Sequence, residues 1–385
     1  MKQGFGKLAS LKEAIEIMHS LVKEKDNESI KLDNALNRVL AGDVTAKIDV
    51  PHFRRAAMDG FAVRAETTFG ASNANPKELD KEDCIETVTG ALLPENMDSV
   101  LMVEYTEKNN GKIKIYKAVT PGENIVNIGS DIKRGDLLLK KGNVLNPRFI
   151  GVLASQGMKE ISAKKKLVIA YFSTGNEILS LNEKLEQGKV YDINSFTIKN
   201  SIINEKCDVI SLGIAKDDKE EIKNKILEGI GKADFLLLSG GSSLGEKDFM
   251  LEAVKELGEV LVHGIAVKPG KPVLIGKVKE KLVLGLPGYP TSALSNFYIL
   301  VLPLIDKILG LKREIKTVKA RLSKKIVSTV GRYEFLAVKL DNDTAIPIQK
   351  GSSAITTLAE ADGFIEIDEN TEVLEKDSSV CVRLF

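Results

Sequence analysis

Between residues 166 and 309 the chain alternates strand-like apolar runs with helix-like runs. The strand-like runs are KLVIAYFS, DVISLGIA, DFLLLSGG, KPVLIGKV and KLVLGLPG, and the helix-like runs are SFTIKNSIINEK, DDKEEIKNKILEGI, DFMLEAVKEL and TSALSNFYILVLPLI. Repeated βα units predict a doubly wound, mainly parallel sheet. Ligands bind such sheets outside the carboxyl ends of the strands, so a functional site is expected in the loops that follow them.

The segments on either side of this region show different sequence patterns. Apolar residues recur at helical spacing over 11–22 and again over 33–40, where Asp33 is expected as an N-cap. Residues 43–140 contain short β-branched runs cut by Gly, Pro and Asn, which predicts a β-rich domain. A helix is expected over 147–156, and alternating short strands after Lys312 predict a C-terminal β domain.

Composition excludes several classes of protein. With 385 residues, 43 % of them hydrophobic, the chain can form more than one core. Lys and Arg total 55 against 54 Asp and Glu, so no overall basic field attracts nucleic acid. The N-terminus lacks the apolar core of a secretory signal, which predicts a cytoplasmic protein. The most apolar stretch, Tyr298–Leu309, contains Pro303 and Asp306 and is expected to form a buried helix rather than a membrane span.

Cysteine and histidine usage argues against two further kinds of site. The three cysteines lie far apart and form no C-x-x-C pair, so neither a zinc ribbon nor a disulfide framework is expected. The three histidines show no metal-binding spacing, and each is expected to be structural.

The loop after the strand-like run FLLL resembles a phosphate cradle. Its sequence, SGGSSLGEKD, has the glycine spacing of a P-loop, but Glu246 occupies the place of the phosphate-binding lysine, which disfavours a conventional nucleotide kinase. Asp248 beside such a loop suggests a divalent cation between carboxylate and phosphate, although a helix cap explains it about equally well. Asp217 could share that metal or cap the next helix, and the cap is favoured when Asp217 is considered alone.

Three more loops offer groups suited to a polar or anionic ligand. STGNE at 173–177 offers hydroxyls and one carboxylate suited to a polar heterocycle, or is an ordinary turn. KPGKP at 268–272 places two ammonium groups on a rigid turn suited to a small oxyanion, although surface lysines on a turn are commoner. LPGYPTSAL at 286–294 is expected to expose Thr291 and Ser292 at a helix start. Several anion-suited loops at one sheet edge together indicate a phosphorylated substrate.

Longer motifs resemble the molybdopterin molybdenumtransferase family, the bacterial MoeA and eukaryotic gephyrin type, over nearly the whole chain. They include PHFRRAAMDGFAVRAE, VTGALLPENMDSVLMVE, GSDIKRGDLLLKKG, LNPRFIGVLASQG, STGNEI, YDINSF, SGGSSLGEKDF, KPGKP, LPGYPTSA and GSSAITTLAEADGFIEI. The resemblance implies four domains: a discontinuous elongated domain (1–44 and 136–165), a β-rich insertion (45–135), a molybdopterin-binding α/β domain (166–312) and a β-barrel-like C-terminal domain (313–385).

The resemblance also implies a function. It predicts a cytoplasmic transferase of molybdenum cofactor biosynthesis that inserts molybdate into adenylylated molybdopterin, with Mg²⁺-assisted release of AMP. The implied assembly is a homodimer whose site combines the α/β domain of one chain with the β-rich insertion of the other. Molybdopterin adenylyltransferase and molybdoenzyme apoproteins are candidate partners, whereas nucleic acid and membrane are not expected. The alternatives are the adenylyltransferase itself, which acts one step earlier, and a non-catalytic scaffold of the same fold.

Site residues follow by similarity. The residues expected in catalysis are Asp59, Thr89, Asp131, Glu177, Asp217 and Asp248, of which Asp217 and Asp248 would lie near the magnesium ion. Those expected to bind substrate are Ser173, Thr174, Gly175, Gly240, Gly241, Ser242, Lys268, Lys271, Pro272, Pro287, Pro290, Ser292, Arg332 and Ser352. The chain departs from the commonest pattern at Tyr289, where Asn is usual, and at Gly264, where some members carry a lysine. The choice between molybdate and tungstate stays open.

Overall fold

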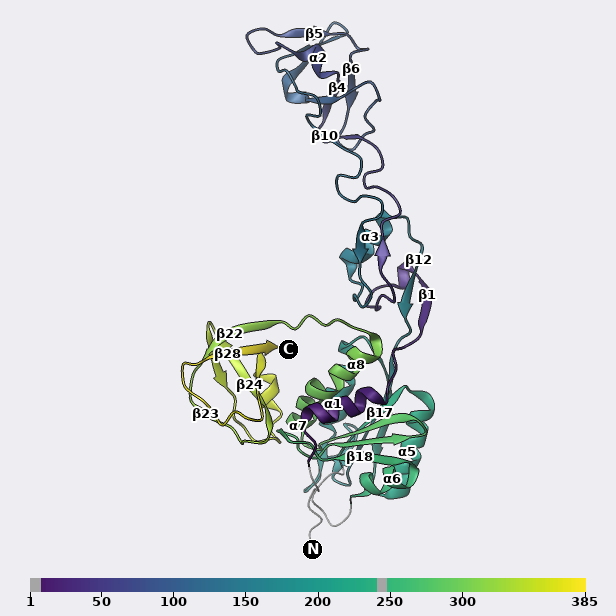
Figure 1. Cartoon of the computed structure of the whole chain (residues 1–385), viewed down its shortest axis with the longest axis vertical. Coiled ribbons are helices and arrows are strands. Elements are labelled where there is room, and N and C mark those ends of the chain that lie inside the picture. The colour runs from purple at the N-terminus through teal and green to yellow at the C-terminus, as the bar shows by residue number, and fades with distance from the viewer. Residues whose placement is uncertain (1–7, 241–247) are drawn as a thin grey trace.

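The computed structural model describes residues 8–240 and 248–385 and shows an elongated molecule (Figure 1). An α/β domain and a C-terminal β domain lie side by side at one end. A small β-rich domain lies at the other end, and a narrow middle region joins them. The chain runs out to the far end and returns, so the middle region is built from two separate segments.

The central sheet of the α/β domain has the strand order β16-β13-β17-β21-β20-β18. Its strands are β13 (Val168–Thr174), β16 (Asp208–Ala215), β17 (Phe235–Gly240), β18 (Glu259–His263), β20 (Leu274–Val278) and β21 (Lys281–Leu286). The pairs β16–β13, β13–β17 and β17–β21 are parallel, whereas β20 runs antiparallel to both of its neighbours. The predicted doubly wound, mainly parallel sheet is confirmed.

Helices cover both faces of this sheet because successive strand residues point to opposite sides. Tyr171 and Leu237 pack on one face, while Phe172 and Leu238 pack on the other. The first face carries α1 (Leu11–Ser20), α4 (Ile193–Asn204), α7 (Pro290–Asn296) and α8 (Leu302–Leu309), and the second carries α5 (Lys219–Lys232) and α6 (Phe249–Leu257).

The apolar C-terminal helix of this domain is longer than the sequence suggested. Helices α7 and α8 join through a π-helical turn, Phe297–Val301, into one helix over Pro290–Leu309 that is long and apolar enough to cross a membrane. However, 72 % of the most apolar stretch of this helix is buried inside the protein. The prediction of a buried core helix is therefore confirmed.

The N-terminal segment confirms one predicted helix and contradicts the other. Ser10 and Glu13 form a capping box at the start of α1. Residues 33–40 are not helical: Asp33 lies in a single 3-10 turn, Leu32–Asn34, and Asn37 adopts a left-handed φ of 63° that ends any helix there. The chain is extended beyond it, and the backbone N–H of Leu40 donates to the carbonyl of Asn143. Val39 and Leu40 are buried where they pair with distant residues, whereas Leu36 is exposed. Periodicity alone does not distinguish such pairing from a helix.

The middle region is held by pairing between its two segments. Strand β1 (Asn27–Lys31) pairs antiparallel with β12 (Glu160–Lys164), and β2 (Val44–Thr45) pairs with β11 (Leu137–Leu139). The helix predicted over 147–156 is α3 (Pro147–Ser155), and the structure shows that the side chain of Asn146 caps it. The exact boundaries between the domains remain a prediction.

An ion-pair cluster fixes the junction between the middle region and the α/β domain. The carboxylate of Glu24 accepts hydrogen bonds from Lys141 at 2.9 Å and from Lys164 at 3.0 Å. These bonds lower the pKa of Glu24 from its ordinary 4.5 to about 2.

The far domain is β-rich, as predicted. Strand β4 (Gly60–Val63) lies between β6 (Cys84–Thr87) and β7 (Ser99–Met102), and β9 (Lys112–Ile115) lies between β5 (Lys77–Leu79) and β8 (Thr106–Asn109). The remaining elements are β3 (Arg55–Ala56), α2 (Ala65–Thr68), a 3-10 turn (Val103–Tyr105) and β10 (Ile125–Val126). Phe61, Leu101 and Ile115 lie in its core.

The C-terminal domain is a closed sheet that is joined to the α/β domain. Its strands are β22 (Thr317–Leu322), β24 (Tyr333–Asp341), β25 (Thr344–Pro347), β26 (Gly363–Ile367) and β28 (Ser379–Leu384), and pairing of β24 with β26 closes the ring. Short elements complete it: β23 (Ile326–Val327), α9 (Thr356–Ala359) and β27 (Val373–Leu374). Strand β19 (Val267–Lys268) of the α/β domain pairs parallel with β24, so the two domains share a sheet.

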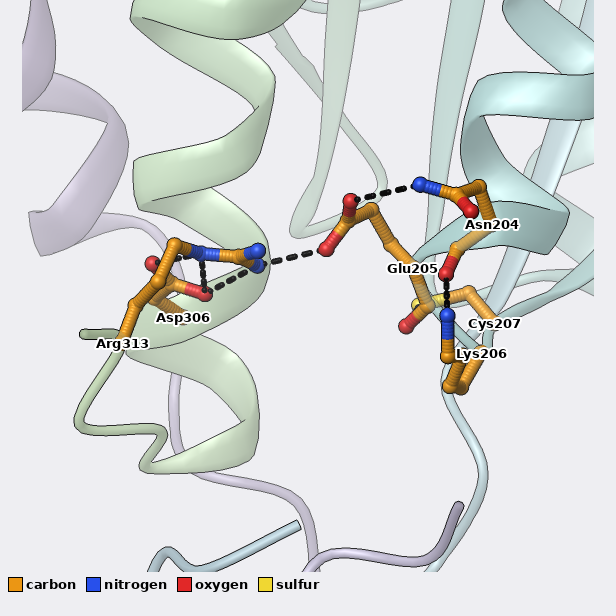
Figure 2. Close-up of polar contacts among 6 residues, drawn as sticks. All are labelled: Asn204, Glu205, Lys206, Cys207, Asp306 and Arg313. Atoms are coloured by element: carbon orange, nitrogen blue, oxygen red, sulfur yellow. Dashed lines mark hydrogen bonds and ion pairs between the residues drawn. The ribbon is translucent and has the colours of Figure 1, made fainter. Parts of the chain in front are cut away.

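The linker between these domains is anchored by Arg313 (Figure 2). Its guanidinium contacts Asp306 of α8 at 2.7 Å and Glu205, just after α4, at 2.6 Å. The three side chains are only 14–27 % exposed. Arg313 thereby holds the chain that leads to β22 against the α/β domain.

Candidate active site

A large cavity lies where the carboxyl ends of the parallel strands face the C-terminal domain. Its volume is about 1250 Å³. One wall is formed by the ends of β13 and β17, the start of α4 and the loops KPGKP and LPGYP, and the other by β24, residues 348–353 and α9. The predicted site residues that line it are Ser173, Thr174, Glu177, Gly240, Lys268, Lys271, Pro272, Pro287, Pro290, Ser292 and Ser352.

A buried hydrogen-bond network supports the wall on the α/β side. The hydroxyl of Tyr171 lies 2.9 Å from Ser173 Oγ and 2.6 Å from Ser239 Oγ. Ser173 Oγ donates to Asp192 at 2.8 Å, and Asp192 also caps α4 through the backbone N–H of Ser195. Burial raises the pKa of Tyr171, so this phenol stays protonated. The network fixes the ends of β13 and β17 relative to the start of α4.

Glycine is required where these strand ends meet. Gly240 has a φ of 106°, and a Cβ at this position would lie 1.9 Å from the carbonyl oxygen of Thr174. Any side chain would push β17 away from β13 at the cavity wall.

Two lysines of the cavity form ion pairs with glutamates. Lys268 Nζ lies 3.0 Å from Oε1 of Glu334, whose side chain is only 6 % exposed. On the opposite wall, Lys350 Nζ lies 2.6 Å from Glu360. Lys271 also lines the cavity, and its carbonyl accepts from the N–H groups of Ile265 and Val273. Lysines thus lie on both walls, and the carboxylates of Glu177, Asp192 and Glu334 line the same cavity.

The helix start after LPGYP is buried, which contradicts the expectation that its hydroxyls are exposed. Thr291 is 5 % and Ser292 is 3 % exposed. The reason is the C-terminal domain: Thr291 Oγ1 donates at 2.8 Å to the carbonyl of Ala354, whose loop covers the helix. Ser292 nevertheless lines the cavity.

Asp217 does not cap helix α5, because the neighbouring Asp218 does so through the N–H of Glu221. Asp217 instead accepts from Thr174 Oγ1 at 3.1 Å and from the N–H of Asn176 at 3.3 Å. It therefore holds the STGNE loop, in which Gly175 leaves room for the Glu177 carboxylate.

Asp248 does act as a helix cap, and it has a second contact. Its Oδ1 accepts from the N–H of Leu251 at the start of α6, and its Oδ2 lies 3.2 Å from His263 Nε2. Asp217 and Asp248 do not line the cavity, and the described ranges contain no cluster of three or more His, Cys, Asp or Glu side chains that could hold a metal alone. The donor chemistry still fits Mg²⁺, which typically uses one or two carboxylates together with substrate phosphates.

The predicted residues of the far domain do not reach this cavity in the single chain (Figure 1). Asp59 Oδ1 accepts from both the N–H and the Oγ1 of Thr89, each at 2.7 Å, and these bonds, the backbone bond first, lower the pKa of Asp59. Asp131 is also exposed, and its N–H donates to the carbonyl of Val50.

Three other predicted residues have different outcomes. Gly241 and Ser242 lie outside the described residues. Arg332 lies just before β24 but is not part of the cavity wall.

Among the cavity residues that sequence reasoning missed are Asp192, Asn194, Lys350 and Thr357. The first two lie in the YDINSF motif, where an Asp and an Asn at a helix start were a usable signal. No local pattern pointed to Lys350 or Thr357, because the tertiary contact with the α/β domain brings them to the cavity.

Comparisons with known proteins agree along the chain. Three family models match: the MoeA N-terminal region, domains I and II, over 9–157; a probable molybdopterin binding domain over 170–307; and the MoeA C-terminal region, domain IV, over 319–385.

Relatives and solved structures cover nearly the full length. A putative molybdopterin biosynthesis protein of Methanocaldococcus jannaschii is 38 % identical over 98 % of both chains. The molybdopterin molybdenumtransferase of Haemophilus influenzae is 32 % identical over 96 % of both. The crystal structure of a molybdopterin biosynthesis MoeA protein from Pyrococcus horikoshii matches with a TM-score of 0.84 and 41 % identity, over 98 % of this chain and 99 % of that one.

Proposed function

The chain belongs to the molybdopterin molybdenumtransferase family, a family of transferases in molybdenum cofactor biosynthesis, and from this we propose that it inserts molybdate into adenylylated molybdopterin and releases AMP. The observation that carries the proposal is the cavity between the α/β and C-terminal domains. It combines cationic groups on both walls with buried hydroxyl and amide groups, as an anionic heterocyclic substrate requires.

In this proposal each wall has a distinct task. Lys268 and Lys271 attract the molybdate dianion, and the fixed Pro-Gly turn holds their backbone in place. The Ser173 and Ser239 hydroxyls, anchored by Tyr171, orient the polar part of the pterin. The two domain walls exclude water from the reacting groups.

A divalent cation is assigned to the acidic residues near the sheet edge. Asp217 and Asp248 would hold Mg²⁺ together with substrate phosphates, and the ion would stabilise the charge that develops on the phosphate as AMP leaves. The hydrogen bonds from Thr174 to Asp217 and from Leu251 to Asp248 keep both carboxylates oriented.

We further propose that the working site is formed in a homodimer. Asp59 and Thr89 are oriented toward each other on the far domain, and exposed apolar side chains surround them in sequence: Met58 is 43 %, Val88 62 % and Leu92 66 % exposed. Exposed apolar side chains beside preorganised polar groups are typical of an interface. A second copy would bring these residues to the cavity of its partner.

The test is AMP release from adenylylated molybdopterin, with and without molybdate and Mg²⁺. The proposal expects release that requires both. ATP-dependent adenylylation of molybdopterin would indicate the earlier adenylyltransferase step, and binding without release would indicate a scaffold.

The dimer is tested by mixing two inactive variants, Asp59→Asn and Asp217→Asn. If sites form between chains, mixed dimers contain one intact site and recover part of the activity. No recovery in dimers shown to exchange would refute the shared site.

A further inference from the structure

Two polar atoms in the cavity wall have no hydrogen-bond partner within residues 8–240 and 248–385: Oδ1 of Asn194 and Oγ1 of Thr357. Both residues line the cavity, and they are only 7 % and 4 % exposed. Asn194 belongs to α4 of the α/β domain, whereas Thr357 belongs to α9 of the C-terminal domain. Buried polar atoms of proteins are nearly always paired, so two such atoms on one cavity call for an explanation.

The orientation of the Asn194 amide is fixed by its nitrogen. Nδ2 donates to the carbonyl of Gly288 at 2.9 Å and to Ser239 Oγ at 3.3 Å. A carbonyl only accepts hydrogen bonds, so the amide cannot be turned to place its own oxygen there. Oδ1 is therefore an acceptor that is held in place without a donor. Leaving such a buried acceptor unpaired destabilises the folded state by about 1–3 kcal/mol.

Thr357 differs from the threonine beside it. Thr356 Oγ1 accepts a hydrogen bond from Lys350 at 3.0 Å. The backbone N–H of Thr357 donates to the carbonyl of Ala354, but its hydroxyl has no partner among the residues that the structure describes. A threonine hydroxyl can both donate and accept. A valine of the same shape would avoid the unpaired hydroxyl, so nothing in the packing of α9 explains Thr357.

We propose that Asn194 Oδ1 and Thr357 Oγ1 form a subsite for the polar edge of a nitrogen heterocycle, which binds between the α/β and C-terminal domains. Oδ1 accepts from an N–H group of the ring edge, and the hydroxyl pairs with a neighbouring ring atom. This subsite rests on the proposed function, whose substrate carries two heterocycles with N–H donors, a pterin and an adenine. The two residues act as specificity determinants and touch no reacting bond.

The decisive variant is Thr357→Val, with Thr356→Val as its matched control on the same helix. The substitution keeps the shape and removes the unpaired hydroxyl. We expect the affinity for the heterocycle to fall by about 3- to 10-fold, the equivalent of one net hydrogen bond. The melting temperature should stay the same or rise, since an unsatisfied buried group has been removed. Thr356→Val should leave the affinity unchanged.

The two heterocycles are tested separately, with 6-hydroxymethylpterin and AMP as probes. Because the chain has no tryptophan, pterin fluorescence can be followed without that background. AMP binding is measured by calorimetry. Weaker binding of the pterin alone assigns the subsite to the pterin edge, and weaker binding of AMP alone assigns it to the adenine.

Asn194→Ala should weaken the same probe as Thr357→Val, and it should also lower the melting temperature because two donated bonds are lost. Unchanged affinity for both probes in both variants would refute the subsite and would mean that water pairs these atoms. Failure of the wild-type protein to bind either probe would instead refute the proposed function.

Discussion

Replacing Arg313 by methionine should destabilise the α/β domain and the linker that follows it. The guanidinium is the shared partner of Glu205 and Asp306, and its removal leaves two carboxylates facing each other in a region where the side chains are 14–27 % exposed (Figure 2). Exposed ion pairs contribute up to about 1 kcal/mol, and breaking a buried pair costs about 3–5 kcal/mol. For this intermediate exposure we expect a loss of about 2–3 kcal/mol.

Differential scanning calorimetry measures this loss. For a folding unit of this size, it corresponds to a melting temperature lower by about 4–12 °C. The matched control is Arg321→Met, because Arg321 pairs with Asp343 at 3.0 Å while both side chains are about two-thirds exposed. The control should change stability by less than about 0.5 kcal/mol.

A second substitution separates charge repulsion from lost packing. Adding Glu205→Gln to Arg313→Met removes one of the two facing carboxylates and should recover part of the stability. If Arg313→Met is no more destabilising than Arg321→Met, the assignment of Arg313 as an anchor is wrong.

Three further predictions concern the backbone, the pH dependence and the thiols. Gly240→Ala should lower the free energy of unfolding by more than about 2 kcal/mol and abolish activity, because its Cβ would lie 1.9 Å from a carbonyl oxygen of β13. Gly231→Ala is the control and should not destabilise the protein, because the space around Gly231 is open. Denaturant unfolding measures both variants. Because the pKa of Glu24 is lowered, its ion pairs stabilise the fold above pH 4.5, and this stabilisation is lost as the pH falls toward 2. The difference in unfolding free energy between wild type and Glu24→Gln should therefore shrink over that range. An unchanged difference would contradict the ion-pair assignment. Exposed Cys381 should react quickly with a thiol reagent at pH 8. Cys207 should react only on unfolding, because burial raises its pKa to about 12. Equal reaction rates of the two thiols would contradict the burial of Cys207.

The sequence predicted most of the α/β domain because most of its strands and helices have a local apolar pattern; the edge strand β18 (Glu259–His263) was not among the predicted runs. The prediction of a helix over 33–40 was wrong because Val39 and Leu40 pair with Val144 and Ala163, which are distant in the sequence. Periodicity reports that a residue is buried, but it does not report by what.

The sequence predicted those residues of the candidate site that lie in loops with a recognisable local motif. The STGNE and LPGYP loops were found because they follow strands, and KPGKP because it places two lysines on a Pro-Gly turn; all three line the cavity. Burial of Thr291 and the roles of Lys350 and Thr357 depend on how the C-terminal domain covers the sheet edge, which no local pattern encodes. The cap at Asp218 rather than Asp217 was a choice between adjacent residues, and one residue is below the precision of helix boundaries from sequence.

The central claim is that this chain transfers molybdenum to the pterin as AMP leaves, and the stoichiometry of a single turnover tests it most directly. Pterin-bound molybdenum and free AMP are measured together, by elemental mass spectrometry and chromatography, for wild type and Asp248→Asn. We expect equal amounts of both products in wild type and a joint loss in the variant. AMP released without molybdenum on the pterin would contradict the account.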